Sequence, residues 1–587
     1  MISAPRPLLP ARSLGVLIVL ALAPLWLSGM FGRGLWTPDE PREADIAWRM
    51  SQQSDRTLPQ LAGTPFLEKP PLSYWMSGAA ISLFGDSAAS ARAPNLLYAV
   101  ITALAVGALA LAMQTDAASA LLAALIAASA LTAFRVSTWL APDACLLAGS
   151  ALALLGAWRG YSAPAGPRKV AGYTLMHLGA AIGFMAKSAP GWLVPALALI
   201  TLIVWERRWS ELRRWELYAG LVLQGLIIGP WLLAVGRTEH GAEALRALFW
   251  NNIVGRFTQV AAPAALDYTT GHHNTPGKYL LELPLYLLPW TFAVAAALWR
   301  AWTRVREAGD SAAAWRFAVA SSLPFLALLS VAATARDIYV APALLGLAVL
   351  TGLWAGDAQR SPTRLDQRAV TGTRVLAGAL GCVLVAALAL LFASGAGPPF
   401  ACLVAALAAS ISTLMALMLA TQSQQRGDLQ RSLTWTYTGY AAALCFTALA
   451  ALPVIDRWQD LPGLARRIHA DCAQQMLALL DPDETTIAML DHGFDSPPTI
   501  LTTNAQAPRG AVTGWFSAHG REARVLVLMP GHAPGPLTRW LERFHGHGPD
   551  GDGIAGSLAA SGTAALLRRY ELPQGRRYAL LGPPPLP

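Results

Sequence analysis

Apolar runs of about 20 residues recur along the chain from Ser13 to Ile455 and limit what it can fold into. A helix of that length crosses about 30 Å of hydrocarbon and satisfies its own backbone hydrogen bonds there. Of the 587 residues, 54% are hydrophobic and 13% are charged, against roughly 25% charged residues in soluble proteins. The pattern predicts a mainly α-helical, polytopic membrane protein with about thirteen transmembrane helices. The first run, residues 13–31, lacks a small-residue cleavage site, so we interpret it as a retained span rather than a secretory signal.

Lys and Arg residues gather in alternate connections between these runs. Such loops face the cytoplasm, so we expect a cytoplasmic N-terminus and place the two long loops of mixed charge, about residues 32–91 and 236–277, outside. An odd number of spans then places the tail outside as well. The basic loops account for the formal net charge of +9, which leaves no patch for nucleic acid. The basic connections contain Arg6 and Arg12; Arg159, Arg168 and Lys169; Arg207, Arg208, Arg213 and Arg214; Arg300, Arg304, Arg306 and Arg316; Arg360, Arg364, Arg368 and Arg374; and Arg426 and Arg431.

The tail differs in character from the rest of the chain. We therefore divide the sequence into a membrane domain, residues 1–455, and a small external α/β domain, residues 456–587. In the tail, the runs "TTIAMLDHG" (485–493), "ARVLVLMPG" (523–531) and "RYALLGPP" (577–584) have β-like composition and are separated by Gly, Pro and polar turns. The stretch "GLARRIHADCAQQMLALL" (463–480) has a helical pattern.

The segment "LWTPDEPREADIAWRM", residues 35–50, packs five charged residues directly after the first apolar run. Thr37, Pro38 and Glu40 fit a capping box with proline at the first helical position, which predicts a helix along the outer surface. That helix would present Asp39 and Glu40 at its N-terminal end. The alternative is a solvated interfacial helix whose charges face water, because runs of charge usually lie at the surface.

A second motif, "FLEKPPLSYWM" at residues 66–76, follows in the same loop. Pro70 biases Lys69 away from helical geometry and Pro71 stiffens the turn, so the lysine is expected on a rigid elbow. The aromatic pair that follows suits the level of the lipid headgroups, which would place the Lys69 ammonium near lipid phosphates. The alternative is an interfacial turn with a lysine that snorkels to water.

The two motifs in this order resemble the first external loop of the aminoarabinose transferase family. These are polyprenyl-phosphate-dependent glycosyltransferases of the GT-C fold, related to protein O-mannosyltransferases. The sequence departs from the family pattern at Pro41 and Arg42, and at "KSAP", where Lys-Gly-Pro is commoner. The resemblance also rests on "APDACLL" at 141–147, on "FWNNIVGRF" and "HHNTPGKYLLELPLYLLPW" between 249 and 290, and on "RDIYVAPALLGLA".

The resemblance implies a pentosyl- or hexosyltransferase of the bacterial inner membrane with a periplasmic tail. It would move a sugar, aminoarabinose or a similar one, from a polyprenyl-phosphate donor to an acceptor at the outer face, with a lipid A phosphate as the main expectation. Membrane lipids would be its other partners. A protein or glycan hydroxyl is the alternative acceptor. A lipid-linked sugar transporter or flippase is the alternative of a different class, but it would carry charges near the middle of its spans and often has repeated halves.

The resemblance also implies roles for cations at the donor. The leaving group is a lipid phosphate, and cations beside it stabilise the charge that develops as the glycosidic bond breaks. Lys69 and Arg256 are the first candidates, and Lys187 and Tyr339 are further candidates for contacts to the phosphate. Arg256 could equally be an ordinary loop arginine, and Tyr339 a residue of the aromatic belt.

Carboxylates are the candidates for chemistry at the sugar. Asp39 would lie nearest to the transferred sugar, as a general base for a hydroxyl acceptor or as an orienting group for a phosphate acceptor, which is already ionised. Glu40 beside it is a second candidate. Asp143 is another, because an ionisable group near membrane depth is often functional, although it could simply start an interfacial helix. The enzyme interpretation expects Asp39, Lys69 and Arg256 to converge on one outward cavity.

A divalent metal is the one cofactor that the resemblance suggests, since some family members hold a metal between the loop glutamate and a histidine. Imidazole and carboxylate groups suit zinc, and the candidate ligands are Glu68, His272 and His273. Adjacent histidines on a polar loop can equally be plain loop residues. No other cofactor is expected.

Overall fold

The computed structural model describes residues 11–61, 63–66, 68–250, 275–307, 309–332, 336–491, 498–503, 508–529 and 553–584. The chain divides into two compact units. The first, which we call the helical unit, comprises Met1–Gly32, Met50–Pro59 and Phe66–Ala451. The second, which we call the sheet unit, comprises Leu452–Pro587 together with two pieces of the first long loop, Arg33–Arg49 and Gln60–Pro65.

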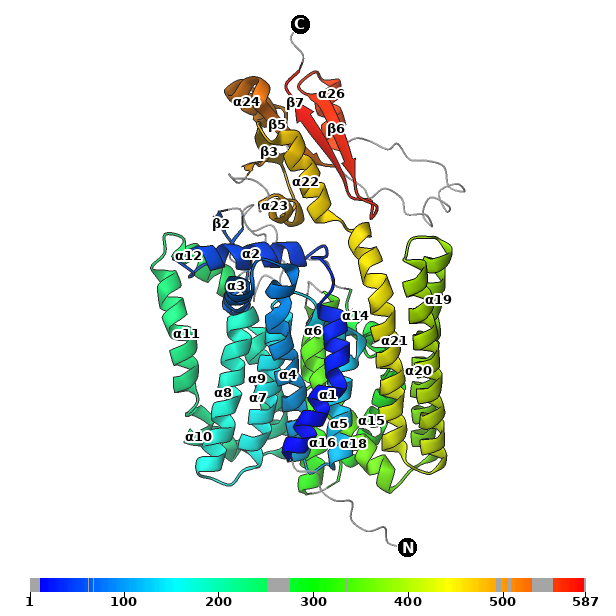
Figure 1. Ribbon diagram of the computed structural model, residues 1–587. Coiled ribbons are helices and arrows are strands. Elements are labelled where there is room, and N and C mark those ends of the chain that lie inside the picture. Colours follow the sequence, from blue (N-terminus) through cyan, green and yellow to red (C-terminus); the bar gives the residue numbers. More distant parts are fainter. Residues whose placement is uncertain are drawn as a thin grey trace. The chain divides into compact units, whose positions relative to one another are not determined.

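The helical unit is a bundle of helices packed side by side (Figure 1). Its helices are α1 (Ala11–Met30), α3 (Leu72–Phe84), α4 (Ala88–Ala112), α5 (Ala117–Ser129), α6 (Leu131–Thr138), α7 (Asp143–Ser162), α8 (Pro167–Lys187), α9 (Pro190–Glu206), α10 (Trp215–Tyr218), α11 (Leu221–Gly236), α12 (Gly241–Arg246), α14 (Lys278–Tyr286), α15 (Thr291–Arg304), α16 (Asp310–Ala320), α17 (Leu323–Val331), α18 (Ala341–Arg360), α19 (Arg364–Ala393), α20 (Pro399–Gln425) and most of α21 (Leu429–Trp458), with short 3₁₀ turns η1 (Trp209–Arg213) and η4 (Asp337–Val340). The inward-facing residues of α1 belong to the same core as those of α4 and α5.

The apolar helices agree with the polytopic helical fold predicted from the sequence. Within the described residues, nine helical segments are long and apolar enough to cross a membrane, and the bent pair α5–α6 makes a tenth. Helices α8, α9 and α15 pack in the same bundle (Figure 1) but do not meet that criterion; α9 has 17 residues and α15 has 14. Nine or ten segments of the described residues therefore meet the criterion, and the protein is a multi-pass membrane protein; the count of about thirteen stays a prediction.

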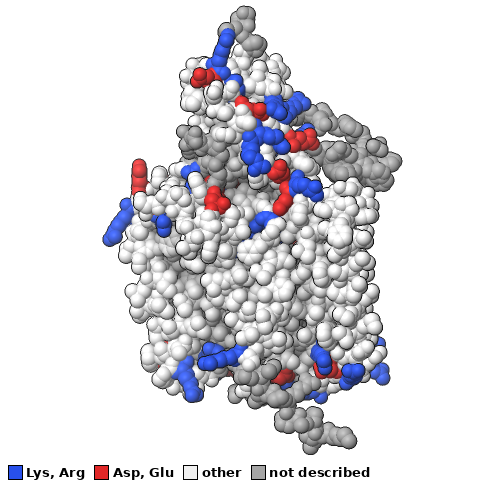
Figure 2. Space-filling view, viewed as in Figure 1, with Lys and Arg blue, Asp and Glu red and all other residues white. Residues whose placement is uncertain are grey.

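Charge is distributed unevenly over the bundle. One face of it carries a broad band without charged residues, and Lys and Arg residues gather below that band (Figure 2). Ion pairs join the helix ends there: Arg304 to Asp357 at 2.9 Å, Arg300 to Asp366 at 2.9 Å, and Arg316 to Glu206. The arginines that the sequence assigns to cytoplasmic loops in this part of the chain thus lie at one end of the bundle.

Helices α7 and α8 form an antiparallel hairpin in which glycines allow very close approach. A Cβ atom on Gly156 would lie 2.2 Å from the Met176 nitrogen, and one on Gly172 would lie 2.3 Å from the Gly160 nitrogen. Small residues let the backbones of membrane helices approach each other in this way. The glycines therefore fix the register of the hairpin, which begins at Asp143 and ends at Lys187.

Gly156→Ala is expected to destabilise the protein by about 1–3 kcal/mol, because the added methyl group must displace the backbone of α8. The matched control is Gly225→Ala in α11, where no atom of the described residues lies within 4 Å of the added Cβ. The control should be neutral or slightly stabilising, since alanine favours helix more than glycine does. Thermal unfolding in detergent measures both variants, and equal Tm values for the two would contradict the close packing.

The sheet unit contains a five-stranded sheet with the order β4-β3-β5-β7-β6. Strand β3 pairs in parallel with β4 and β5, and β7 pairs antiparallel with β5 and β6. The strands are β3 (Met476–Leu480), β4 (Thr499–Leu501), β5 (Ala523–Leu528), β6 (Ala565–Glu571) and β7 (Arg577–Gly582), and the helices are α22 (Leu461–Cys472), α23 (Glu484–Asp491), α24 (Pro508–His519) and α26 (Gly553–Ala560), with a 3₁₀ turn η5 (Gly520–Glu522). The loop pieces add a small hairpin, β1 (Gln60–Leu61) and β2 (Thr64–Pro65), and the first part of α2 (Glu40–Gln52).

Both faces of this sheet are covered by helices. Along β3, Leu477 and Leu479 face a core that includes residues of α22, whereas Ala478 and Leu480 face a core that includes residues of α24 and α26. This alternation buries the strand on two sides. The predicted α/β character of the tail is confirmed.

Two of the secondary-structure predictions for the tail are wrong. The run 485–493 is not a strand: Glu484–Asp491 forms helix α23, because the Asp483 carboxylate accepts a hydrogen bond from the Thr486 amide at 2.9 Å and caps the helix. The helical pattern from residue 463 ends at Cys472, and Met476–Leu480 forms β3. There the apolar run is buried on both faces of the sheet, where periodicity does not distinguish strand from helix.

Candidate functional site

Five charged residues of the segment 35–50 are buried. Asp39 is 6% exposed, Glu40 0%, Arg42 6%, Glu43 2% and Asp45 0%. The alternative of a solvated helix is therefore wrong. Charges at this depth are tolerated only when they are paired and hydrogen-bonded, so the charge pattern of this segment reflects a buried network rather than a wet surface.

Glu40 holds the turn that precedes α2. Its two carboxylate oxygens accept hydrogen bonds from the Arg33 guanidinium at 2.6 and 2.9 Å, and one of them also accepts from the Trp36 amide at 2.9 Å. Arg33 in turn stacks on the Trp36 ring, with 4.3 Å between the guanidinium carbon and the ring centre. Both oxygens of Glu40 are thus engaged in local structure.

Arg42 connects Asp39 with the tail of the chain. Its guanidinium lies 3.3 Å from an Asp39 oxygen and 2.7 Å from a Glu43 oxygen, and it forms an ion pair with Glu484 of α23. All four residues belong to the sheet unit. Arg42 therefore holds the Asp39 carboxylate, and it is one of the positions at which this sequence departs from the family pattern.

The predicted capping box does not form. Helix α2 begins at Glu40, and the Thr37 amide and hydroxyl both donate to the Gln459 side-chain oxygen, at 2.9 and 3.0 Å. The Glu40 carboxylate turns to Arg33 and Trp36 instead of capping Thr37. The prediction failed because Gln459, distant in sequence, takes the polar groups of Thr37, while Arg33 and Trp36 nearby take the Glu40 carboxylate.

Three predicted site residues meet in the helical unit. The Lys187 ammonium lies 2.5 Å from an Asp143 oxygen and 4.3 Å from the centre of the Tyr339 ring. They come from the end of α8, the start of α7 and the turn η4 before α18. Asp143 is buried, and Lys187 and Tyr339 are partly buried. A carboxylate and an aromatic face thereby fix the position of one cation.

The turn after Lys187 carries backbone strain. Ser188 has a φ of 60°, in the left-handed region that favours glycine. It occupies the "KSAP" turn, where the family more often has Lys-Gly-Pro. A carbon added to Gly191 would lie 2.2 Å from the Gly183 backbone, so α9 starts tightly against α8.

Lys69 lies on the elbow before α3. It is 9% exposed, and its ammonium lies 3.7 Å from a Glu68 oxygen. Three residues later, Leu72 packs with Ala144 and Ala186, the chain neighbours of Asp143 and Lys187. The elbow is therefore anchored beside the hairpin that carries the Asp143–Lys187 pair.

Trp75 of this motif anchors the loop. The Trp75 indole donates a hydrogen bond to the Arg56 carbonyl at 2.9 Å, and the Trp231 indole of α11 donates to the Thr57 carbonyl at 3.0 Å. Trp75 thus ties α3 to Arg56, and Trp231 ties α11 to Thr57.

Arg256, His272 and His273 lie outside the described residues, so the expected convergence of Asp39, Lys69 and Arg256 stays a prediction. In the part of the chain that the structure describes, no group of three or more His, Cys, Asp or Glu residues could hold a metal ion. The Glu68 carboxylate lies 3.7 Å from the Lys69 ammonium. The positive charge of Lys69 would repel a metal ion bound by Glu68. The metal site also stays a prediction.

Some contacts of the candidate residues were missed in the sequence. Arg42 is three positions after Asp39, a spacing at which helical side chains meet, so that pair carried a readable signal. Glu484 is 442 positions from Arg42, and nothing in the sequence links them. Asp337, two residues before Tyr339, forms an ion pair with Arg135 at the end of α6.

Comparison with known proteins finds relatives of this sequence. Residues 17–245 match the family model described as dolichyl-phosphate-mannose-protein mannosyltransferase. A curated relative from Serratia proteamaculans, named undecaprenyl phosphate-alpha-4-amino-4-deoxy-L-arabinose arabinosyl transferase, is 29% identical over 380 residues, 65% of each chain. A relative of the same name from Edwardsiella ictaluri is 31% identical over 333 residues, 56% of each chain. The chain thus spans about two thirds or less of the length of these relatives.

The fold extends over nearly the whole chain. The crystal structure of ArnT from Cupriavidus metallidurans bound to undecaprenyl phosphate superimposes with a TM-score of 0.68 and 18% identity, over 96% of this chain and 97% of the other. At that identity the likeness concerns the fold. The chain therefore has the fold of that structure, and in sequence it is similar to the undecaprenyl phosphate-aminoarabinose arabinosyl transferases, in agreement with the resemblance that the loop motifs indicated.

Proposed function

We propose that this chain is a membrane glycosyltransferase that moves a sugar from a polyprenyl-phosphate donor to an acceptor at the outer face of the bacterial inner membrane. The observation that carries the proposal is its similarity to relatives named undecaprenyl phosphate-aminoarabinose arabinosyl transferases. Those names supply the donor lipid, undecaprenyl phosphate, and the sugar, 4-amino-4-deoxy-L-arabinose. A lipid A phosphate is the acceptor that we favour.

The cluster around Lys187 supports this chemistry. An acceptor oxygen attacks the anomeric carbon, the bond from that carbon to the phosphate oxygen breaks, and the lipid phosphate leaves with the electron pair. In this proposal Lys187 and Lys69 stabilise the charge on that leaving group, and the Tyr339 hydroxyl donates a hydrogen bond to it. Asp143, 2.5 Å from the Lys187 ammonium, acts in this proposal as a positioning residue.

Glu40 and Asp39 have different roles in this proposal. Both oxygens of Glu40 are engaged with Arg33, so we assign Glu40 to structure. Asp39, held by Arg42, remains the carboxylate for the sugar or the acceptor. A divalent metal has no assigned step here.

A hydroxyl acceptor is the second candidate, and a specific observation favours it. The family model that matches residues 17–245 is named for a protein mannosyltransferase, whose acceptor is a protein. The same donor chemistry would then require removal of a proton from the acceptor hydroxyl.

The direct test is transfer by the purified, reconstituted full chain. Undecaprenyl-phosphate-linked sugars are supplied as donors, with lipid A, dephosphorylated lipid A and a serine-containing peptide as acceptors, and products are identified by mass spectrometry. We expect donor-dependent addition of the pentose to lipid A but not to the dephosphorylated form. Failure of every donor to give a glycosylated product, with folded protein, would favour the transporter class instead.

The proposed orientation predicts a labelling pattern in intact spheroplasts. A cysteine at the exposed Ser517 of α24 should react with a membrane-impermeant thiol reagent, because the tail is proposed to be periplasmic. A cysteine at the exposed Ser361, beside Arg360 at the basic end of the bundle, should react only after lysis. Labelling of Ser361→Cys before lysis, with Ser517→Cys protected, would reverse the orientation.

A further inference from the structure

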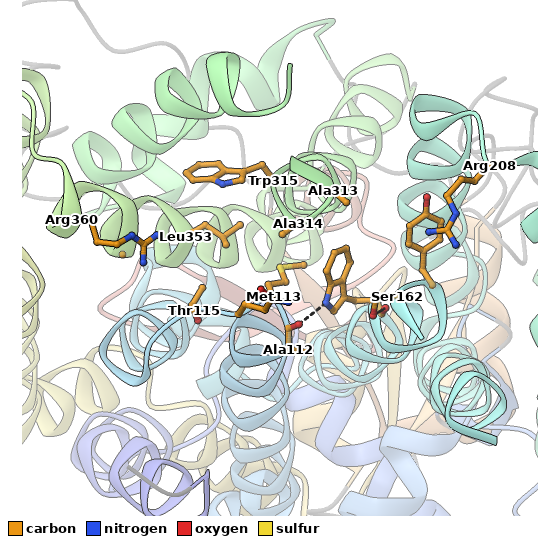
Figure 3. Close-up of a pocket in the computed structure, with 14 residues that line it drawn as sticks. Ala112, Met113, Thr115, Ser162, Arg208, Ala313, Ala314, Trp315, Leu353 and Arg360 are labelled. Carbon is orange, nitrogen blue, oxygen red and sulfur yellow. Dashed lines mark hydrogen bonds between the residues drawn. The ribbon is translucent and has the colours of Figure 1, made fainter. Parts of the chain in front are cut away.

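A pocket of about 470 Å³ lies among the ends of helices α4, α7, α16 and α18 (Figure 3). Its lining includes Ala112, Ser162 and Arg360, which are the last residues of three of the apolar segments. Apolar spans end where the hydrocarbon ends, so this pocket lies at the depth of lipid headgroups. It is at the end of α7 opposite to Asp143.

The charge of this pocket is positive. Among the described residues that line it, Arg208 and Arg360 are charged and none is acidic. The two arginines lie at opposite sides of the pocket, and Met113 and Leu353 lie between them (Figure 3). The interior is aromatic, because Trp158, Tyr161 and Trp315 line it and are buried.

The carboxylate near Arg360 is shared with closer cations. Asp357 lies 2.8 Å from the Arg300 guanidinium and 2.9 Å from that of Arg304, whereas Arg360 is 3.8 Å away. Arg300 also pairs with Asp366 at 2.9 Å and Arg304 with Glu307 at 2.8 Å, so Arg360 is the most loosely paired cation of this cluster. The Arg360 side chain is 68% exposed, so it can turn towards another anion at little cost.

The carboxylate near Arg208 is shared in the same way. Glu211 lies 2.5 Å from the Lys169 ammonium and 3.3 Å from the Arg214 guanidinium, whereas Arg208 is 3.7 Å away. The Arg208 guanidinium stacks instead on the Tyr161 ring, 4.3 Å from its centre. This stacking keeps the guanidinium at the rim of the pocket, and its ion pair with Glu211 is the longest of the three.

We propose that this pocket binds the phosphate of an anionic membrane phospholipid from the basic side of the membrane. The fork of N–H groups on an arginine matches phosphate oxygens, so Arg208 and Arg360 each offer a phosphodiester a binding group at their own side of the pocket. The less polar glycerol part packs against Leu353 and Trp315. The headgroup depth favours a lipid over a soluble phosphate. The site is separate from the proposed transfer chemistry and does not depend on it.

The test measures lipid binding to the purified full chain by native mass spectrometry, with phosphatidylglycerol and phosphatidylcholine titrated in detergent. Wild type should bind phosphatidylglycerol about tenfold or more tightly than phosphatidylcholine. The double variant Arg208→Gln/Arg360→Gln should lose that preference. The matched control Arg159→Gln/Arg426→Gln removes two exposed arginines from basic connections that do not line the pocket, and it should keep the preference.

A second variant separates the pocket from surface charge. Ala313→Phe fills the pocket and leaves every charge in place, so it should weaken phosphatidylglycerol binding about tenfold; it also decides the matter if the double variant does not fold. Equal binding of the two lipids to wild type would overturn the proposal, and so would an equal loss in the control pair. Full displacement of the lipid by equimolar glycerol 3-phosphate would contradict the lipid and show that the pocket binds a soluble phosphate.

Discussion

Asp39→Asn is expected to lower turnover at saturating donor without unfolding the protein, and the pH dependence of the loss identifies the acceptor. Asparagine keeps the size of the side chain and one oxygen for the Arg42 guanidinium, which lies 3.3 Å from Asp39. With a hydroxyl acceptor, loss of a general base costs about 10²- to 10⁴-fold in turnover. With a phosphate acceptor there is no proton to remove, and only an orienting or electrostatic contribution is lost.

We expect the second pattern, in which alkaline pH does not restore the variant. Turnover is measured from neutral to alkaline pH for wild type, Asp39→Asn and the control Asp55→Asn. A hydrogen bond from Thr57 lowers the pKa of Asp55, so this exposed carboxylate in the same loop is ionised throughout the assay. Its removal subtracts the same charge and should leave turnover unchanged. A steep alkaline rescue of Asp39→Asn would assign a hydroxyl acceptor.

The sequence was most informative where physical constraints act locally. Hydrocarbon thickness sets the length of each apolar run, so the helical architecture followed from composition and spacing. Asp143, Lys187 and Tyr339 were each selected for their positions at the ends of spans. The contact between Asp143 and Lys187 could not be predicted in the same way. It depends on how α7 and α8 are aligned along each other, and the backbone contacts of Gly156 and Gly172 show that alignment.

The sequence was least informative where partners are distant. The segment 35–50 was recognised as charged, yet the burial of its charges depends on pairs such as Arg42 with Glu484, 442 positions apart. Thr37 shows the same effect, since Gln459 took the bonds that a local capping box would have used. In the tail, the β-branched run 485–487 suggested a strand, but capping by Asp483 outweighed that propensity.

Lys69→Gln is expected to lower kcat by about 10²- to 10³-fold, the range for loss of one group that stabilises developing charge. The donor phosphate already carries charge before the reaction, and it gains more as the glycosidic bond breaks. A cation that acts on the gained charge changes kcat, whereas one that binds the ground state alone changes KM. Lys69 is 9% exposed, and the limited access of water strengthens its interaction with a phosphate.

The control is Arg56→Gln, which removes an exposed cation of the same loop whose described hydrogen bonds go to the Gln53 and Ser51 carbonyls. It should leave kcat and KM unchanged. Thermal unfolding separates catalysis from structure, because the Lys69 ammonium also lies 3.7 Å from Glu68. Lys69→Arg keeps the charge and should recover part of the lost kcat, although its planar fork cannot reproduce the position of the ammonium. Wild-type kcat in Lys69→Gln would show that Lys69 does not act on the leaving phosphate. A loss of kcat that parallels a lowered Tm, with no recovery in Lys69→Arg, would assign Lys69 to the structure of the elbow instead.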